Sequence, residues 1–504
     1  MKFYKIIFLF FVISFGHSQE ISGIVIDSLN NEPIPFAAII SNFDNNTITN
    51  EEGRFRIFKS TSFTNQDSLF ISSIGFNSLS LALNEKYKIQ IVLSAKVIQL
   101  KSVEVRNRKK MTAIQIIDKV KNNVKNVYDF DYSSKKIFWR ETIIGETTEI
   151  DLKIKKSSIK EFDQKFMDSI TSTIPKKSNF YIETLSEFYG NRNPEKQKIN
   201  AIKSAQLLNK ESQISLDLLE KKIQPIVELR IKPDSYFKFK SGIFPVDLSV
   251  DGVDLRAIDS TDVSRLEKIK NKKLDERKNF NLTNRNFIRE MSNYYIDFKK
   301  KKLNLEVFNK SRMYDFILLE LSYLGDEPVY IIDYFPRSSK VKYKGRIYIH
   351  ADDFALIRYD YQSIEPLRDF NLFGVSFKLE NRHGTRIFKK NYNKKYDLYF
   401  SENFIQRSFG LDRPLKIIEK NKNVRGRRKQ NQLNMNINFN ANAKVKTEFI
   451  VLNYLDLKKN DFDLYKEIES DIPFELIEYD PEFWKGYNII EPSQAIKEFK
   501  IEKN

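Results

Sequence analysis

The sequence contains no cysteine. This absence excludes disulfide bonds, thiolate metal sites, a catalytic cysteine and a lipid anchor on an N-terminal cysteine. Hydrophobic cores alone must therefore hold the fold, and a chain of 504 residues is long enough to build them.

Histidine and glycine are also scarce, with three and 15 residues. No Gly-x-Ser-x-Gly or His-Glu-x-x-His motif occurs, and no glycine-rich phosphate loop is present. His350 precedes Asp352 and Asp353, but no third ligand stands at metal spacing, so we expect a strand-end turn there. The composition of residues 381–384 predicts a turn that leaves His383 solvated.

Two carboxylate pairs remain as candidates for acid–base chemistry, Asp251 with Asp254 and Asp352 with Asp353. A glycosidase needs two carboxylates at a defined separation, and pairs close in sequence arise by chance among 67 acidic residues. We therefore expect no catalytic, cofactor-binding or metal-binding residues, no cofactor, and a protein that is not an enzyme.

Long hydrophobic runs are confined to the N-terminus. Lys2 and Lys5 precede ten apolar residues, 6–15, and small residues follow near Ser18, which is the layout of a signal peptide. The run is shorter than the roughly 20 residues that a spanning helix needs. Residues 1–18 are therefore predicted to direct export to the periplasm or outer membrane, leaving a soluble or peripheral mature chain.

The formal net charge is +18, and it is unevenly distributed. Residues 421–430 hold five basic residues and no acidic one, whereas residues 461–504 hold twelve acidic and five basic residues. A basic surface attracts nucleic acid, anionic lipid or acidic glycan, and export excludes nucleic acid. Ordinary surface solvation explains much of the charge. The acidic segment is expected either to contact a basic partner or to fold back on the basic body.

Short strands separated by turns fill residues 20–106. The runs are residues 21–27, 34–41, 47–50, 53–58, 68–74, 76–83, 87–93 and 100–105. Apolar and polar residues alternate over 53–58, as in a half-buried strand, and the regular spacing predicts a β-sandwich.

Five segments of this region, in order, resemble the carboxypeptidase regulatory-like domain. They are residues 23–27, 32–37, 49–55 and 67–76, with a closing pair at 91–93 and 100–105. The resemblance implies a seven-stranded, prealbumin-like sandwich, an accessory domain without catalytic residues. Such domains stand at the N-terminus of TonB-dependent outer-membrane receptors and of shorter envelope proteins.

The remainder is predicted to be a larger β-rich α+β region. An apolar stripe over residues 111–128, with Thr112 as cap, predicts a helix. The stripe consists of Ile114, Ile117, Val120, Val124 and Val127. Further helices are expected at 212–223 and, exposed, at 262–278, for which a mobile insert is the alternative.

Strands are expected throughout the rest of this region. Their ranges are 136–144, 148–154, 180–189, 329–335, 340–350, 355–361, 370–380, 385–400 and 445–452, with a bulge at Gly345. Residues 345–350, 354–357, 479–484 and 487–492 resemble the uncharacterised remainder of those shorter envelope proteins.

The expected organisation is a signal peptide (1–18), the sandwich (20–106), a mixed region (107–310), an antiparallel β-rich region (311–460) and an acidic segment (461–504). We expect a non-catalytic accessory or interaction protein at the periplasmic face of the outer membrane, with an outer-membrane or periplasmic protein as partner. The alternative is a carrier that binds a lipid or glycan on a curved β-sheet. A hydrolase with an unrecognised carboxylate site has the least support.

Overall fold

The computed structural model describes residues 19–499 apart from 44–45, 60–62, 84–87, 97–110, 209, 233–234, 242–248, 251–262, 422, 424 and 427. Strands hold 52% of the residues and helices 20%, which confirms the mainly β prediction. The predicted signal peptide, the strand at 100–105, the break at 107 and the Asp251–Asp254 pair lie outside the described residues.

Contacts divide the chain into two compact units. Unit 1 comprises Met1–Val97, Tyr323–Gly325 and Asp480–Ala495, and unit 2 comprises Ile98–Ser322, Asp326–Tyr479 and Ile496–Asn504. The C-terminal segment therefore contributes to both units, and each unit is described separately below.

Unit 1 contains the predicted sandwich. Seven strands form two sheets, with orders β4-β1-β7 and β3-β2-β5-β6. Their bounds are β1 Gln19–Asp27, β2 Ala38–Ser41, β3 Asn46–Ile48, β4 Arg54–Lys59, β5 Ser68–Ser72, β6 Leu79–Ala82 and β7 Lys88–Leu93.

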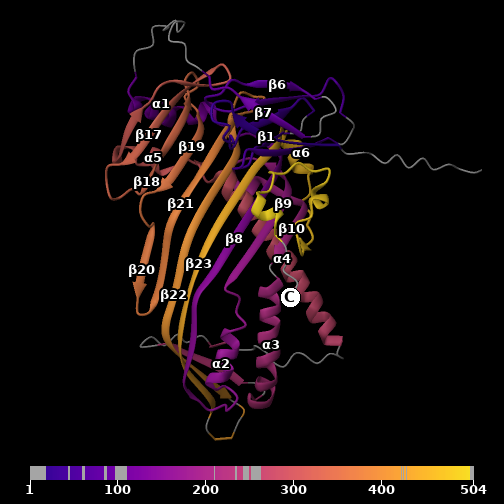
Figure 1. The fold of residues 1–504 in the computed structure, drawn as a ribbon, viewed down its shortest axis with the longest axis vertical. Helices are drawn as coiled ribbons and strands as arrows, with labels where there is room; N and C mark the ends of the chain where they lie inside the picture. Colours follow the sequence, from indigo (N-terminus) through magenta and orange to yellow (C-terminus); the bar gives the residue numbers. More distant parts are fainter. Residues whose placement is uncertain are drawn as a thin grey trace, which may run out of the picture. The chain divides into compact units, whose positions relative to one another are not determined.

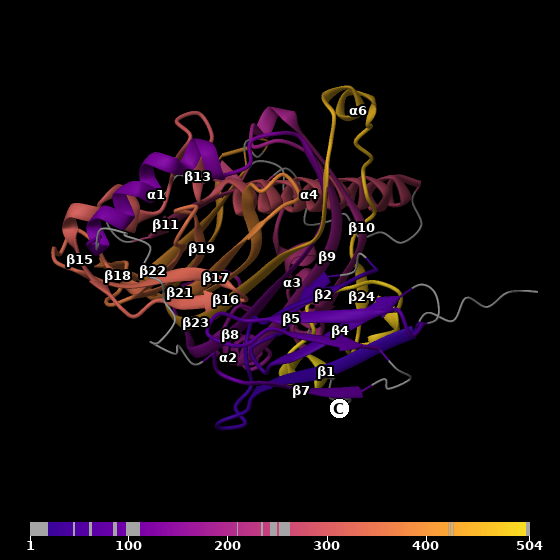
Figure 2. The same cartoon turned by 90° about the horizontal axis from the view of Figure 1, so that it is seen from above.

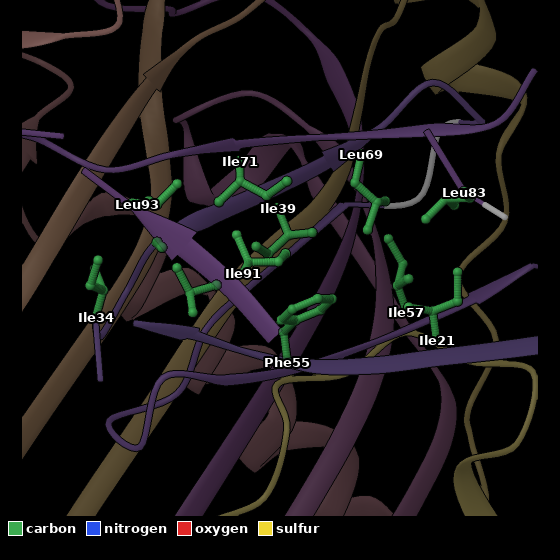
Figure 3. Packing of buried hydrophobic residues seen from close by; sticks show 12 residues of the cluster. Ile21, Ile34, Ile39, Phe55, Ile57, Leu69, Ile71, Leu83, Ile91 and Leu93 are labelled. Carbon is green, nitrogen blue, oxygen red and sulfur yellow. The ribbon is translucent and has the colours of Figure 1, made fainter. Parts of the chain in front are cut away.

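The two sheets share one apolar core. Phe55 and Ile57 of β4 point inward, as the alternation of that strand predicts, and meet Ile39, Leu69 and Ile71 of the other sheet (Figure 3). All five side chains are fully buried. Burial of each contributes about 1.5–3 kcal/mol, so this core stabilises the domain without disulfides.

The C-terminal segment Asp480–Ala495 packs on the β3–β4 side of this sandwich. Arg56 Nε donates to Glu491 Oε2 at 2.8 Å, and the Phe58 backbone N–H donates to Asn488 Oδ1 at 2.7 Å. Asn50 Nδ2 also donates to the Glu491 carbonyl, at 3.2 Å. For this stretch the acidic segment folds back on the chain, one of the two expected outcomes.

Unit 2 is built on one long, mostly antiparallel sheet (Figure 1). The path of the sheet is β15-β17-β18-β19-β21-β22-β23-β8-β9-β10-β24, so it joins strands from both sides of residue 311. The bounds on this path are β8 Ser133–Ser157, β9 Lys177–Gly190, β10 Gln197–Leu208, β15 Tyr314–Leu318, β17 Glu327–Pro336, β18 Tyr343–His350, β19 Leu356–Ser363, β21 Val375–Lys390, β22 Tyr396–Asn421, β23 Lys429–Asp456 and β24 Phe474–Leu476. The remaining strands are β11 Ser235–Ser241, β12 Ser249–Val250, β13 Ile296–Asp297, β14 Lys302–Leu303, β16 Ser322–Leu324 and β20 Arg368–Leu372.

Helices cover one face of this sheet, and α4 lies on its concave side (Figure 2). The helices of the chain are α1 Ala113–Val127, α2 Gln164–Thr171, α3 Lys210–Arg230, α4 Val263–Asn293, α5 Glu306–Asn309, α6 Lys459–Leu464 and α7 Gln494–Lys497, with 3-10 turns η1 Pro194–Lys196, η2 Ser311–Met313 and η3 Pro481–Trp484.

Helix α1 confirms the predicted cap, because Thr112 and Gln115 form a reciprocal capping box. The predicted apolar face was partly wrong, since Ile114 is 40% exposed while Ile116 is buried. Helix α4 is longer than expected. Within the predicted range the described residues 273–278 are mostly exposed, as expected, whereas the unpredicted continuation of the helix buries Phe280, Asn284 and Ile288.

Four predictions about strands were wrong in detail. Residues 136–154 form one strand, β8, instead of two. Residues 370–380 form a hairpin with its turn at Phe373–Gly374, and residues 385–400 are divided between β21 and β22. The bulge predicted at Gly345 is absent from the described strand pair, which shifts register at Tyr348/Ile349. Gly345 pairs in regular register with Tyr361. Glycine is needed at this position because a Cβ there would lie 2.0 Å from the Asp360 carbonyl oxygen.

Candidate functional site

The part of the unit 2 sheet where β20 pairs with β21, and β21 with β22 and β23 beyond it, has one apolar and one polar face. Register places Phe370, Phe377 and Phe409 side by side on β20, β21 and β22, and Leu372, Val375 and Leu411 side by side in the next row. Phe439 of β23 continues the second row. We call these seven residues the apolar panel. Because side chains alternate along a strand, the neighbouring residues face the other way.

Those neighbours are polar. The rows opposite the panel contain Asp369, Lys378, Ser408 and Asn442, and then Asn371, Ser376, Gly410 and Asn440. A sheet with this pattern keeps one face in water and buries the other. The apolar panel therefore has the composition of a face that another group covers.

The panel is nonetheless open in the described structure. Phe370 is 47% exposed, Leu372 49% and Phe409 41%. Single exposed apolar residues are ordinary on a protein surface, but large aromatic and aliphatic side chains in adjacent rows form a continuous patch. Contiguous patches of this kind mark sites of ligand or partner binding.

The panel belongs to the same face that the helices cover elsewhere. Alternation along β22 from Phe409 to Ser401, and pairing of Ser401 with Phe449 and of Phe449 with Trp139, place Trp139 on this face. Trp139 stacks on Phe287 of α4 with ring centroids 4.4 Å apart. Below the panel, Met167 and Ile170 of α2 pack with Met435 and the partly buried Leu219 of α3. In the described residues the panel lies between these two helix-covered regions.

The hairpin between β20 and β21 adds one more exposed aromatic residue. Phe373 and Gly374 form its two-residue turn with φ of 52° and 74°, and Phe373 is 58% exposed. A bulky residue in the left-handed region is strained, and Asn is far commoner at this position. Gly374 is required, since a Cβ would lie 1.9 Å from the Asp412 carbonyl oxygen. Strain of this kind occurs at functional loops, so the turn belongs to the candidate site.

Arginines border the panel along the sheet. Arg368 and Arg407 flank Leu379 in the row above it, and Arg413 lies below it. Arg413 Nη2 donates to the Ser241 carbonyl at 2.8 Å. On the same face, burial raises the pKa of Glu141 and the charge of Arg407 opposes that rise.

The opposite face carries a charged row higher on the sheet. Arg140 bonds to Glu183 at 2.6 Å and lies 3.3 Å from Glu448, and all three are buried. Lys446 contacts Glu402 at 3.0 Å in the same group. Each charge has an opposite partner, which is the arrangement of a structural network.

A second polar network surrounds a small pocket at the upper end of unit 2. Asp397 accepts hydrogen bonds from Arg192 at 2.8 Å, from the Tyr295 hydroxyl at 2.7 Å, and from Lys135. Burial opposes ionisation of Asp397, but Lys135 and Arg192 outweigh it and hold its pKa well below the usual value. The pocket has room for about one water molecule, ≈ 10 Å³, which is too small for a substrate.

Of the candidate residues from the sequence that the structure describes, His350 and Asp353 lie together, with His350 Nδ1 3.5 Å from Asp353 Oδ2, and His350 Nε2 lies 3.3 Å from Glu327. His350 caps the turn after β18, as predicted, and its Nδ1 accepts from the Asp353 backbone N–H at 3.1 Å. Asp353 accepts from Tyr396 and Lys390, both at 2.7 Å, and its pKa is lowered although burial opposes this. His383 was wrongly assigned to a turn, because it lies inside β21 and stacks on Phe404 at 4.6 Å.

Two further features are missing from the described residues. No group of three or more His, Asp or Glu residues is placed to hold a metal ion. Among the helices of that same part of the chain, none combines the length and apolar character needed to cross a bilayer.

The apolar panel was missed in the sequence, although its signal is present. Residues 368–379 alternate apolar and polar on both sides of Phe373–Gly374. The turn was not recognised because it lacks the Asn-Gly or Asp-Gly pair that usually identifies a two-residue hairpin. Without the turn, the two runs could not be placed beside each other.

Comparison with known proteins agrees with the N-terminal assignment. Residues 21–105 match the family model of the CarboxypepD_reg-like domain, which confirms the predicted resemblance for that part of the chain. Among curated proteins, none matches the chain. A solved structure from Bacteroides fragilis NCTC 9343, of a protein of unknown function proposed to be membrane-associated, is similar at 8% identity and a TM-score of 0.13. The alignment covers 87% of this chain and 99% of the other.

Proposed function

We propose that this protein is a non-catalytic, exported protein of the periplasm or outer membrane that binds the hydrocarbon chain of a lipid on the apolar panel. The row of Phe370, Phe377 and Phe409 on an amphipathic sheet, with Phe370 and Phe409 exposed, carries the proposal. Covering such a row with an acyl chain stabilises the complex by about 25 cal/mol for each Å² of apolar surface removed from water.

The dimensions of the panel suit an extended chain. The two rows of the panel lie two residues apart along each strand, which is about 7 Å, and Arg407 and Arg413, six positions apart on β22, border them. The four strands from β20 to β23 span about 14 Å across the sheet. An apolar strip about 14 Å long and two rows wide accommodates a hydrocarbon chain better than it accommodates a compact glycan, whose hydroxyl groups need polar partners.

A neutral apolar fluorophore, N-phenyl-1-naphthylamine, tests the proposal on the full-length protein. We expect saturable binding to the wild-type protein and at least tenfold weaker binding to Phe409→Asp. Asn442→Asp is the matched control, since it places the same charge on the polar face of the neighbouring strand. Absence of saturable binding, or equal binding by Phe409→Asp, would overturn the proposal.

The sandwich of unit 1 favours a second, compatible role as an interaction module. In the described residues β6 and β7 are sheet edges, and Val92 of β7 is 48% exposed. Edge strands pair with a strand from another chain. A photo-crosslinking residue at Val92 should capture a defined envelope protein, while the same residue at the exposed Leu29 should not. Identical adduct patterns at both positions would contradict this role.

A further inference from the structure

The row above the apolar panel contains two arginines that face the same way as the panel. Arg368 pairs with Leu379, and Leu379 pairs with Arg407, so the two arginines lie two strands apart, about 10 Å between Cα atoms. Their row is two residues from Phe370 and Phe409, about 7 Å along the strands. Both side chains are long enough to reach one group held above Leu379.

These two arginines differ from the other arginines on that face. Arg382 Nε donates to Asn403 Oδ1 at 2.9 Å, and Arg386 lies 4.6 Å from the ring centre of Tyr294. Arg413 bonds to a backbone carbonyl. Arg368 and Arg407 are instead both exposed, and the charge of Arg407 acts on Glu141 of the same face.

A ligand on the panel would change the surroundings of these arginines. Covering the neighbouring Phe row removes water from the guanidinium groups, which costs free energy unless an anion replaces that water. A neutral lipid would not compensate the guanidinium groups for this lost water, whereas an anionic head group would form charge-assisted hydrogen bonds with their planar N–H groups.

We propose that the ligand is a single-chain anionic amphiphile, with its hydrocarbon chain on the apolar panel and its head group bound by Arg368 and Arg407. This inference rests on the proposed function and specifies its ligand class. A long-chain fatty acid is the simplest member of that class.

Palmitate and hexadecanol distinguish the head group from the chain, because their chains are equal in length and only palmitate is charged. Each is titrated against the full-length protein loaded with N-phenyl-1-naphthylamine. We expect palmitate to displace the fluorophore at a concentration at least about tenfold lower than hexadecanol, as two charge-assisted contacts predict. In the double variant R368Q/R407Q this preference should disappear, with displacement by hexadecanol unchanged.

Lys378→Gln is the control, since it removes one positive charge from the polar face of β21 and should keep the preference. Equal displacement by palmitate and hexadecanol in the wild-type protein would overturn the head-group site and leave the proposed function standing. A preference that survives R368Q/R407Q would also overturn it. Failure of the fluorophore itself to bind would instead refute the proposed function, and the inference with it.

Discussion

Arg56 Nε lies 2.8 Å from Glu491 Oε2, although 435 residues separate them in the sequence. The side chain of Arg56 is 11% exposed and that of Glu491 is 4% exposed. This buried ion pair holds the C-terminal segment to the strand that the family match places in the N-terminal domain. The domain of this chain is therefore completed by residues outside the matched range.

Glu491→Ala should destabilise unit 1 by about 2–3 kcal/mol, because it removes the carboxylate closest to the buried Arg56 and leaves Glu20 at the longer distance of 3.4 Å. Hydrogen exchange of a peptide covering β4 measures this directly, and its protection should fall. Glu482→Ala removes an exposed partner of Lys485 and should cost less than about 1 kcal/mol. Equal effects of the two variants would show that the pair does not fix the segment.

Asp397→Asn should destabilise unit 2 by about 3–5 kcal/mol, since it leaves Lys135 and Arg192 buried without their carboxylate. The folded pKa of Asp397 is below its unfolded value. Its contribution is therefore complete above about pH 4 and is lost as the pH falls through the folded pKa. Urea titrations at pH 7 and pH 3 should show a smaller difference between wild type and variant at pH 3. A difference that is equal at both pH values would contradict this account.

Lys389→Met should stabilise the protein at pH 7, because burial lowers the pKa of Lys389 to about 8. From pH 8 to 10.5 the unfolded chain keeps this proton and the folded chain loses it, so wild-type stability rises. The advantage of the variant should shrink over that window in thermal melts. Lys390→Met, the control, removes an ion pair with Asp353 at 2.7 Å and should be destabilising at pH 7.

Gly384→Ala should cost about 3 kcal/mol, at the upper end for overpacked sites, since its Cβ would lie 2.2 Å from the Glu402 carbonyl oxygen. Gly145→Ala is the comparison. Its Cβ would meet Ser178 Oγ, which can rotate away, so we expect a cost below about 1 kcal/mol. Urea midpoints of the two variants measure the difference, and similar midpoints would refute the steric explanation.

Local patterns predicted much of the fold. The sandwich strands up to residue 93, the Thr112 cap and helix α1 depend on neighbouring residues, and each was found; the strand expected at 100–105 lies outside the described residues. The continuous strand β8 was not predicted, because the polar stretch around Gly145 looks like a turn. That stretch stays extended because β23 and β9 pair with it on both sides.

The candidate site could not be predicted from local sequence patterns. Phe370, Phe377 and Phe409 become neighbours only through the register of three strands, and Arg56 meets Glu491 only through the return of the C-terminus. For His383, local composition predicted a feature, a turn, that the sheet does not contain. Its neighbours Asn381 and Gly384 have turn composition, yet Gly384 serves to make room for Tyr361, whose hydroxyl oxygen lies 2.7 Å from a Cβ built there.

The most direct test of lipid binding on the apolar panel is native mass spectrometry of the full-length protein purified from its own envelope. We predict one bound acyl lipid per chain in the wild-type protein and in Asn442→Asp, and its loss in Phe409→Asp. A wild-type spectrum without bound lipid, or a lipid retained equally by Phe409→Asp, would contradict the account.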